Sequence, residues 1–192
     1  MLNPRPSKFR LARVLEPALL GDAEELHALR EAAAQWLVDR GIRQWRPGEV
    51  DVGTIHAQLA AGEWFVHRRA RRVVVALRFL WTDPDFWGRQ PDDAAYVHGL
   101  VIDCRHAGEA LGAAALDWAG DRARAAGRPY LRLDHAADNA RLARFYRELG
   151  FVERGRRQFD AWGAVTLVEK PLTRKTPEVD DLRGSPGTTG TR

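Results

Sequence analysis

Hydrophobic residues recur along the chain with two different periods, and each change of period marks the start of a new element. Continuous or alternating runs of β-branched and aromatic residues predict strands, whereas apolar residues three and four positions apart predict helix faces. The predicted strands are 9–15, 64–67, 73–81, 96–102, 130–134, 151–153 and 165–169. The predicted helices are 22–41, 52–61, 108–126 and 139–149. The order β-α-α-β-β-β-α-β-α-β-β is typical of an α/β domain built around one mixed sheet.

Short polar signals mark the ends of several predicted helices. Asp22 and Glu25 have the spacing of a capping box, in which two side chains bond reciprocally to backbone N–H groups at a helix start. Gly41, Gly62 and Gly150 follow the last apolar residue of three helices, where a left-handed residue is favoured. These signals give each of those helices a definite beginning or end.

A change of composition near residue 173 sets the predicted domain organisation. Residues 1–172 carry the whole periodic pattern and predict one domain. More than half of residues 173–192 are Gly, Pro, Ser or Thr, and almost none are apolar. Such a segment buries too little apolar surface to offset its ordering entropy, so we expect 173–192 to be a disordered tail.

The overall composition narrows the class of protein. With 45% hydrophobic and 29% charged residues the chain reads as an ordinary globular protein. The single Cys104 excludes an internal disulfide framework and suits a reducing compartment. Residues 1–10 are basic without an apolar stretch, and no run reaches the roughly 18 apolar residues of a membrane span. We therefore expect a cytoplasmic monomer or homodimer that has no membrane partner.

The net charge of +4 is small, and its arginines are scattered. The densest basic runs, 68–72 and 154–157, flank predicted strands and fit solvated turns better than a nucleic-acid interface. We expect no nucleic-acid partner, whereas attraction to small anionic molecules fits the charge.

Residues 105–112 give the most informative chemical signal. They follow the buried strand 96–102 and open the next helix, and residues 107, 108, 110 and 112 are small. N–H groups at a helix start lack partners within the helix, and the helix dipole there favours negative charge. Because small residues let an anion approach the main chain, the pattern predicts a phosphate-bearing cofactor at this turn. The predicted cofactor contacts are Arg105, His106, Ala107, Gly108, Glu109, Ala110, Leu111 and Gly112.

Two motifs occur in order, separated by the strand 130–134. The first, R-x-x-G-x-G/A, is matched by Arg105, Gly108 and Ala110. The second, N-x-x-A-x-x-(F/L)-Y-x-x-x-G-F, is matched at Asn139, Phe145, Tyr146, Gly150 and Phe151. In both motifs and in the element order, over about residues 9–171, the chain resembles the GNAT superfamily of acyl-CoA-dependent N-acetyltransferases. The resemblance implies a mixed, mostly antiparallel sheet of six to seven strands flanked by about four helices.

The resemblance also implies an activity and roles for particular residues. The activity is transfer of an acetyl group from acetyl-CoA, without a metal, to a primary amine of a small molecule or a protein N-terminus, by direct attack in a ternary complex. In the family the pantetheine arm lies along the fourth strand where that strand splays from the fifth. That implies cofactor contacts at Leu100, Val101 and Ile102, with one N–H polarising the thioester carbonyl. Gly99 suits a backbone that another group approaches closely.

By the same resemblance, Asn139 would bond the pantetheine and Tyr146 would protonate the departing thiolate. The two residues are two helical turns apart and share a face. Tyrosine has an ordinary pKa of about 10, so it holds a proton at neutral pH and can donate it. The other interpretation of Tyr146 is a core residue, because it continues the apolar stripe of Leu142 and Phe145.

Two residues depart from the family pattern. Glu109 places a carboxylate beside the expected pyrophosphate, which is repulsive unless it points outward or pairs with Arg105 or another nearby arginine. Leu142 replaces a usual small residue, which we interpret as a packing change. Glu109 keeps a second function open: an acyl-CoA-binding sensor module that is weak or inactive in catalysis.

The sequence leaves the general base open among three candidates. Asp134 ends the strand 130–134, and some relatives that modify protein N-termini have a carboxylate there. His98 lies on the strand 96–102 with an ordinary pKa of about 6.5, which suits proton abstraction, although the alternation also fits a buried structural histidine. A bound water leading to either group is the third.

The substrate pocket is expected between the first helices and the loop after Trp81. Aromatic and acidic walls there suit an amine with an apolar body. The candidate lining residues are Trp36, Trp45, Trp81, Asp83 and Trp87, with Phe86, Glu49 and Asp85 as further neighbours. A dinucleotide-binding domain of the Rossmann type is disfavoured, because three strands precede the glycine turn consecutively and an Arg-rich helix follows it.

Overall fold

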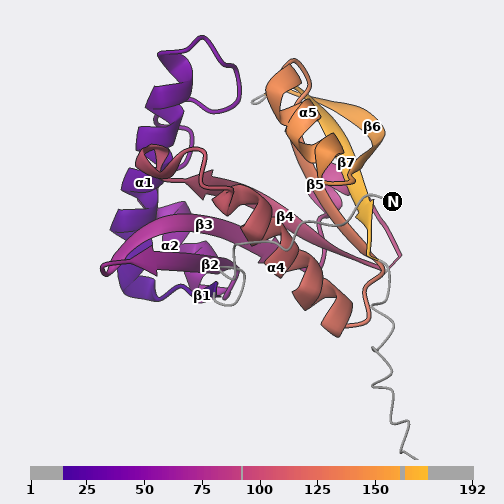
Figure 1. Cartoon of the computed structure of the whole chain (residues 1–192), viewed down its shortest axis with the longest axis horizontal. Helices are drawn as coiled ribbons and strands as arrows, with labels where there is room; N and C mark the ends of the chain where they lie inside the picture. Colours follow the sequence, from indigo (N-terminus) through magenta and orange to yellow (C-terminus); the bar gives the residue numbers. More distant parts are fainter. Residues whose placement is uncertain (1–14, 92, 161–162, 173–192) are drawn as a thin grey trace, which may run out of the picture.

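Figure 1 shows a computed structural model of the chain, which describes residues 15–91, 93–160 and 163–172. The strands are β1 (Glu16–Pro17), β2 (Trp64–Arg69), β3 (Arg72–Leu80), β4 (Ala94–Ile102), β5 (Tyr130–Ala136), β6 (Val152–Phe159) and β7 (Gly163–Pro171). The helices are η2 (Leu20–Asp22), α1 (Ala23–Val38), α2 (Val52–Ala60), α3 (Pro84–Trp87), η3 (Cys104–His106), α4 (Leu111–Ala125) and α5 (Ala140–Glu148). The predicted strand 9–15, apart from Leu15, and the predicted tail 173–192 lie outside the described residues.

The strands form one mixed sheet in the order β1-β2-β3-β4-β5-β7-β6. Only the β4–β5 pairing is parallel among the described strands, and the neighbouring pairs are antiparallel. The prediction of a mostly antiparallel sheet of six to seven strands is thereby confirmed. The parallel pair lies at the middle of the sheet, with a helical crossover through α4 between its strands.

Strand β4 loses its pairing with β5 partway along its length. The ladder between them ends at Val97 and Leu133, whereas β4 continues to Ile102 and β5 to Ala136. Just past that point the register of β4 against β3 shifts, and Gly99 has a φ of 58°. A bulge bends a strand and increases its local twist. The carboxyl ends of β4 and β5 therefore part, and the two wings of the sheet diverge in Figure 1.

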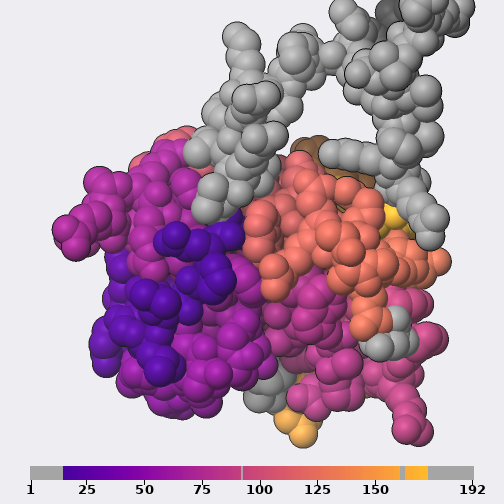
Figure 2. All heavy atoms as spheres, turned by 90° about the horizontal axis from the view of Figure 1, so that it is seen from below, coloured from indigo at the N-terminus to yellow at the C-terminus, as the bar shows by residue number. Residues whose placement is uncertain are grey.

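Helices cover both faces of the sheet. In Figure 1, α4 crosses the near face, where its Leu116 and Tyr146 of α5 share a buried cluster with Leu133 of β5. On the other face, Leu26 of α1 and Ile55 of α2 are buried in a second cluster. A third cluster joins α3 to β4 and β7. Seen from below in Figure 2, the indigo and purple N-terminal half lies beside the salmon-coloured α4.

The capping box predicted from Asp22 and Glu25 is wrong. The Asp22 carboxylate accepts a hydrogen bond from Leu19 N at 2.7 Å and one from Arg68 at 2.6 Å. The Glu25 carboxylate instead accepts from Val73 N at 3.0 Å, which ties α1 to β3. Both acidic groups thus have partners far along the chain, and tertiary contacts override the local motif.

The start of α4 and the loop before β4 also differ from the pattern. The helix begins at Leu111 rather than at 108, because Gly108 and Ala110 have φ values of 88° and 57° and cannot belong to an α-helix. The predicted loop at 83–91 contains α3, which the sequence pattern did not predict. The described residues therefore hold five α-helices where about four were expected.

Replacement of Gly99 by Ala tests the bulge. A Cβ there would lie 3.0 Å from the Trp64 ring in addition to adopting a left-handed φ, so we expect the free energy of unfolding to fall by about 2–4 kcal/mol. Gly62→Ala is the matched control, since its φ is 72° but no atom lies within 4 Å of the added Cβ. Strain alone should cost that variant about 1 kcal/mol in urea unfolding. Equal losses in both variants would contradict close packing at Gly99.

Candidate active site

Three titratable side chains meet where β4 and β5 begin to part. His98 of β4 is bonded through Nε2 to the Asp83 carboxylate at 2.9 Å and through Nδ1 to the Asp134 carboxylate at 3.3 Å. Asp83 lies at the start of α3, and Asp134 lies on β5. The three side chains are only 6–15% exposed. The sequence candidates His98 and Asp134 are therefore in direct contact, and Asp83 joins them from the loop after β3.

Burial changes the proton affinity of the cluster formed by Asp83, His98 and Asp134. It raises the pKa of Asp134 to about 6, an effect that His98 opposes and that the charge of Asp83 reinforces. Both nitrogens of His98 face carboxylates, so a proton on either nitrogen is stabilised by a charged acceptor. The arrangement can therefore take up and release a proton near neutral pH. Within the described ranges, no three His, Cys, Asp or Glu side chains are grouped so as to hold a metal ion.

Tyr146 lies on the opposite face of the sheet, on α5. It is buried against the His135 ring, with a centroid separation of 5.6 Å, and against Phe145 and Phe151. Burial raises the pKa of its hydroxyl well above the ordinary value, and the charge of Asp134 adds to this shift. The Tyr146 hydroxyl therefore holds its proton at neutral pH.

Asn139 caps the start of α5. Its Oδ1 accepts a hydrogen bond from Leu142 N at 3.1 Å, so the carbonyl half of the side chain is committed to the helix. Its Nδ2 is directed to Gln44 Oε1 at 3.5 Å. Asn139 thus caps α5 through Oδ1 and donates to Gln44 through Nδ2.

The turn between β4 and α4 presents backbone N–H groups at the start of a helix of 15 residues. Two left-handed residues, Gly108 and Ala110, flank Glu109 and set the path of the turn. The first N–H groups of α4, on Leu111 and Gly112, have no helical partner one turn earlier. Successive N–H groups in such a turn form a concave site for an anion.

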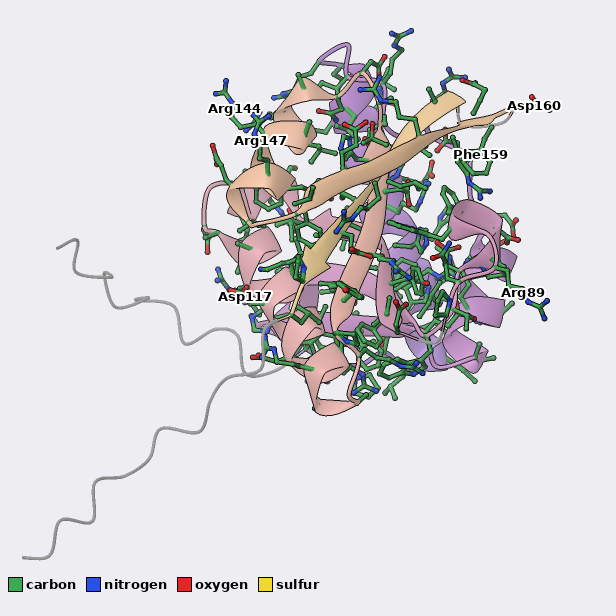
Figure 3. All side chains as sticks on the ribbon, turned by 90° about the vertical axis from the view of Figure 1, so that its right-hand side faces the viewer. Arg89, Asp117, Arg144, Arg147, Phe159 and Asp160 are labelled. Carbon is green, nitrogen blue, oxygen red and sulfur yellow. The ribbon has the colours of Figure 1, made fainter. Side chains whose placement is uncertain are left out.

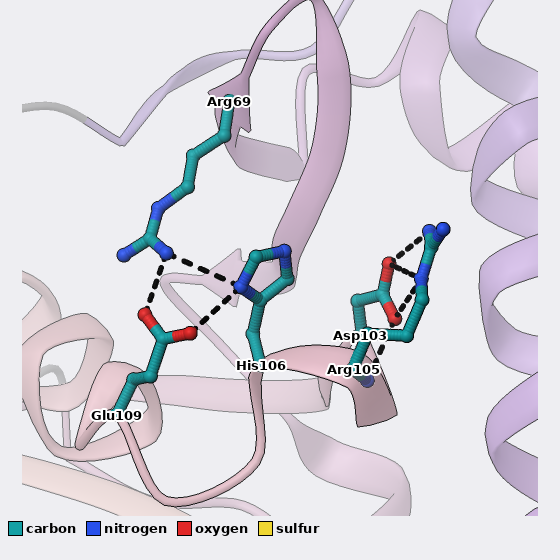
Figure 4. A network of polar contacts seen from close by, with 5 residues as sticks. All are labelled: Arg69, Asp103, Arg105, His106 and Glu109. Atoms are coloured by element: carbon teal, nitrogen blue, oxygen red, sulfur yellow. Dashed lines mark hydrogen bonds and ion pairs between the residues drawn. The ribbon is translucent and has the colours of Figure 1, made fainter.

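Charges around this turn are paired with one another, as Figure 4 shows. Arg105 donates to Asp103, with distances of 3.0 Å from Nε and 2.5 Å from Nη2. Glu109 is bonded to His106 at 2.8 Å and to Arg69 of β2 at 2.5 Å. These two partners hold the pKa of the Glu109 carboxyl below its ordinary value, with His106 the larger cause. Arg69, rather than Arg105, therefore offsets the carboxylate.

Comparison with known proteins identifies the family. The profile described as "Acetyltransferase (GNAT) family" matches residues 30–151. The chain is 33% identical over 166 residues to "Uncharacterized N-acetyltransferase YesJ" of Bacillus subtilis, covering 82% of this chain and 89% of that protein. The chain belongs to the GNAT acetyltransferase family.

Solved structures with the same fold include two described as acetyltransferases. A GNAT-family acetyltransferase from Listeria monocytogenes superposes with a TM-score of 0.68 at 24% identity, covering 83% of this chain and 94% of that one. The yncA protein of Salmonella typhimurium, described as a putative acetyltransferase with its cofactor acetyl-CoA, gives a TM-score of 0.61 at 19% identity, covering 85% and 95%. As a GNAT acetyltransferase, the chain is an acyltransferase whose fold is that of an acetyl-CoA-binding relative.

The structure separates the expected GNAT substrate residues into two groups. Asp83 is at the His98 group, whereas Trp87 is buried against Tyr96 and under Arg132, so it packs the core instead of lining a pocket. The Arg30 guanidinium of α1 lies over the Trp45 ring, and the guanidinium of Arg40, which follows α1, lies over the Trp36 ring. Trp81 packs on Phe79 and lies beside Trp118 and Arg122 of α4, on the other side of the sheet from Asp83.

Phe159 is a neighbour of the site that the sequence did not indicate. Its ring is 4.7 Å from that of Phe86, which in turn lies 5.0 Å from the His98 ring. Figure 3 shows Phe159 at the end of β6 and Arg89 pointing outward below it. No local pattern marks this contact, because Phe86 lies on α3 in the connection between the central strands β3 and β4, whereas Phe159 ends the edge strand β6.

The strand register distinguishes among the expected cofactor contacts on β4. Asp103 N donates to Val74 O at 2.9 Å, and Val101 pairs with Ala76, so Val101 turns its backbone groups toward β3. By alternation, Ile102 turns its N–H toward the gap beside β5, which makes Val101 the least suitable of the expected β4 contacts.

Among the described helices, none has the length and apolar character needed to cross a membrane.

The double function of Asn139 can be separated by two substitutions. Asn139→Ala removes the cap acceptor, so we expect a loss of about 1 kcal/mol in the free energy of unfolding. Asn139→Asp retains an acceptor at the cap and should be close to wild type in stability, although it lacks the Nδ2 donor. Chemical unfolding of both variants checks this. A similar loss in the two would show that the amide donor, not the cap, stabilises α5.

Proposed function

We propose that the chain transfers an acetyl group from acetyl-CoA to a primary amine by direct attack within a ternary complex. The observation that carries the proposal is the placement of a proton donor and a proton acceptor on the two faces of the sheet where β4 and β5 part. Tyr146 is on the face covered by α4 and α5, and Asp134 with His98 is on the other face. A thioester lying between the strands is then within reach of both.

The coenzyme is held by the turn before α4 and by the parted strands. The N–H groups of Gly108, Ala110, Leu111 and Gly112 receive the pyrophosphate, because those of Ala107 and Glu109 already donate to Cys104 O and His106 O. Pairing of Glu109 with Arg69 draws the Glu109 carboxylate away from the phosphates. The pantetheine arm follows β4, with Leu100 and Ile102 as the expected backbone contacts and Asn139 Nδ2 as a donor from α5. An N–H of β4 in the gap polarises the thioester carbonyl and stabilises the oxyanion that forms on attack.

The proton transfers can be assigned to residues already placed. The amine nitrogen bonds to the thioester carbonyl carbon, and the carbon–sulfur bond breaks. The leaving thiolate takes the proton of the Tyr146 hydroxyl, whereas the surplus proton on nitrogen passes to Asp134. His98 is already engaged by carboxylates at both nitrogens, so it supports Asp134 rather than facing the amine itself. Tyr146 regains its proton from the Asp134 group or from water.

The acceptor is a primary amine of a small molecule or a protein N-terminus. A protonated amine is attracted to the carboxylates Asp83 and Asp134, and it loses that proton to water before attack, so Asp134 stays ionised to take the second proton that attack releases. The rings of Phe86 and Phe159 provide an apolar wall next to His98. This combination suits an amine that carries an apolar body.

The alternative of an inactive acyl-CoA sensor rests on Glu109. Its pairing with Arg69 and His106 weakens that alternative, because the carboxylate is neutralised without using a backbone N–H of the turn. Release of free CoA from acetyl-CoA in the presence of a panel of amines separates the two functions. Tight binding of acetyl-CoA with no release by any amine favours the sensor.

Replacement of Tyr146 by Phe removes the proposed proton donor and retains the ring that packs on His135 and Phe151. We expect kcat to fall by about a hundredfold or more, because a positioned general acid contributes about 10²–10⁴. Thermal stability and the Kd for acetyl-CoA should stay close to wild type. Wild-type thiol release by this variant would remove Tyr146 from the mechanism.

The pH dependence of the reaction should report the proposed base. Asp134 accepts a proton only when it is ionised, and burial raises its pKa to about 6. Expressed per unprotonated amine, kcat/KM should therefore be level at neutral pH and fall as the pH drops through about 6. Asp134→Asn should lower the rate and abolish this limb.

The matched control for that profile is Asp138→Asn. Asp138 lies four residues after Asp134, in the connection between β5 and α5, but it is half exposed and pairs with Arg43. Its variant should keep the wild-type limb. An unchanged limb in Asp134→Asn would assign the base to another group.

A further inference from the structure

A glutamine from the segment between α1 and α2 bonds to the far side of the gap between β4 and β5. Gln44 Oε1 accepts a hydrogen bond from Ala136 N at 3.1 Å and lies 3.5 Å from Asn139 Nδ2. These partners are more than ninety residues away in the sequence. A side-chain amide carbonyl is thus held by two donors at the end of β5, beside the residues assigned to chemistry.

The strand register explains why the Ala136 N–H can donate to a side chain from outside the sheet. Ala137 N, just past the end of β5, donates to Ala164 O of β7, so alternate residues of β5 turn their backbone groups toward β7. Ala136 therefore turns its N–H toward β4. Since the β4–β5 ladder has ended at Leu133, no β4 carbonyl is paired with it.

Ala136 N–H and Asn139 Nδ2 together make an amide-carbonyl subsite, of which the Asn139 contact is the one that the family resemblance already implies. We propose that Gln44 occupies this subsite as a competitor, so that the carbonyl oxygen of a ligand amide must displace it. The inference rests on the proposed function. It deepens that function by naming the chemistry that the end of β5 recognises. Two substrates could supply the amide: the pantetheine arm of acyl-CoA, which contains two amides, and a peptide acceptor.

A ligand must displace Gln44 because the Ala136 N–H group has a single hydrogen to donate. A backbone N–H has one hydrogen, so Ala136 serves either Gln44 or a ligand carbonyl at full strength. The ligand carbonyl and Gln44 have the same acceptor group, and the exchange replaces one amide bond with another. Gln44 thus competes with the ligand, and its removal should improve binding.

The segment that carries Gln44 is held firmly at its base and weakly at its tip, so Gln44 can leave Ala136 and Asn139. At its base, the Arg30 guanidinium lies 4.9 Å from the Trp45 ring centroid and 3.4 Å from Glu49, and Gly48 N donates to Glu31 at 2.9 Å. At its tip, the only ion pair toward β5 and α5 among the described residues joins Arg43 to Asp138, both well exposed. An exposed pair contributes little to stability, so release of Gln44 is energetically cheap.

The test is direct binding to Gln44→Ala, measured by calorimetry with acetyl-CoA. We expect the Kd to fall about threefold to tenfold, which is the scale of one amide hydrogen bond. Gln35→Ala is the matched control, because Gln35 is an exposed glutamine of α1 that bonds only to Asp39 in the described residues. Gln44→Asn, whose shorter amide cannot reach Ala136, is the second variant and should behave like Gln44→Ala.

Two ligand arms identify the source of the amide. If the pantetheine arm fills the subsite, the tighter binding should appear with acetyl-CoA and with S-acetylpantetheine, and it should be absent with ethyl thioacetate, which has no amide. If a peptide acceptor fills it, the Kd for acetyl-CoA should not change, and the KM should fall for an N-terminal peptide but not for a simple alkylamine. Either pattern supports the subsite.

The proposal is overturned if Gln44→Ala and Gln44→Asn leave every binding constant at the wild-type value. It is also overturned if both variants bind acetyl-CoA more weakly without loss of melting temperature, because Gln44 would then be a ligand contact rather than a competitor. Failure of the wild-type protein to bind acetyl-CoA is a different result. That outcome rejects the proposed function, and calorimetric binding of the N-terminal peptide alone to the wild type and to Gln44→Ala then tests the subsite.

Discussion

Everything at the candidate site depends on the loss of pairing between β4 and β5 beyond Val97 and Leu133. Two parallel strands in the middle of a sheet normally satisfy each other's backbone groups along their full length. Here a left-handed glycine and a register shift bend β4 away. The bend leaves backbone donors and acceptors of both strands facing a gap in an otherwise continuous sheet. Such groups need partners, so the distortion that parts the strands also creates an extended hydrogen-bonding surface for a ligand.

The same gap explains how groups on opposite faces of a sheet can act on one bond. A continuous sheet keeps side chains of alternate residues apart, and Asp134 and His135 obey that rule: one meets His98, the other stacks on Tyr146. Where the strands part, a ligand between them can contact groups on both faces of the sheet. Burial is the larger cause of the raised pKa of Tyr146, and the charge of Asp134 raises it in the same direction. A substrate between the strands then meets a proton donor on one side and an acceptor on the other.

The sequence predicted the parts of the site that depend on local structure. Residues 105–112 combine small size with a helix start, so turn chemistry is sufficient to single them out as candidate cofactor contacts. The roles of Asn139 and Tyr146 are implied by the motif resemblance, and periodicity alone places Tyr146 in an apolar stripe. The contacts that give these residues their setting are not local. Asp83 and His98 are joined across two elements, Glu109 is offset by Arg69 from β2, and Gln44 reaches β5 across more than ninety residues. Such pairs follow from strand order and register, which no pattern along a single chain specifies. The failed capping box has the same cause, since Arg68 bonds to the Asp22 carboxylate and Val73 N to the Glu25 carboxylate.

Charge at the turn before α4 shows how a departure from a family motif can be accommodated. The four ionic side chains there form two matched pairs, Arg105 with Asp103 and Arg69 with Glu109, so their summed charge is near zero. An anion at the turn would then be bound mainly by backbone N–H groups and the helix dipole, with little help from long-range attraction. That arrangement favours recognition by geometry over recognition by charge: a diphosphate that fits the concave path set by Gly108 and Ala110 is bound, whereas other anions gain little from the neutral surroundings. Glu109 is therefore compatible with coenzyme binding as long as Arg69, supplied by a hairpin far away in sequence, stays paired with it.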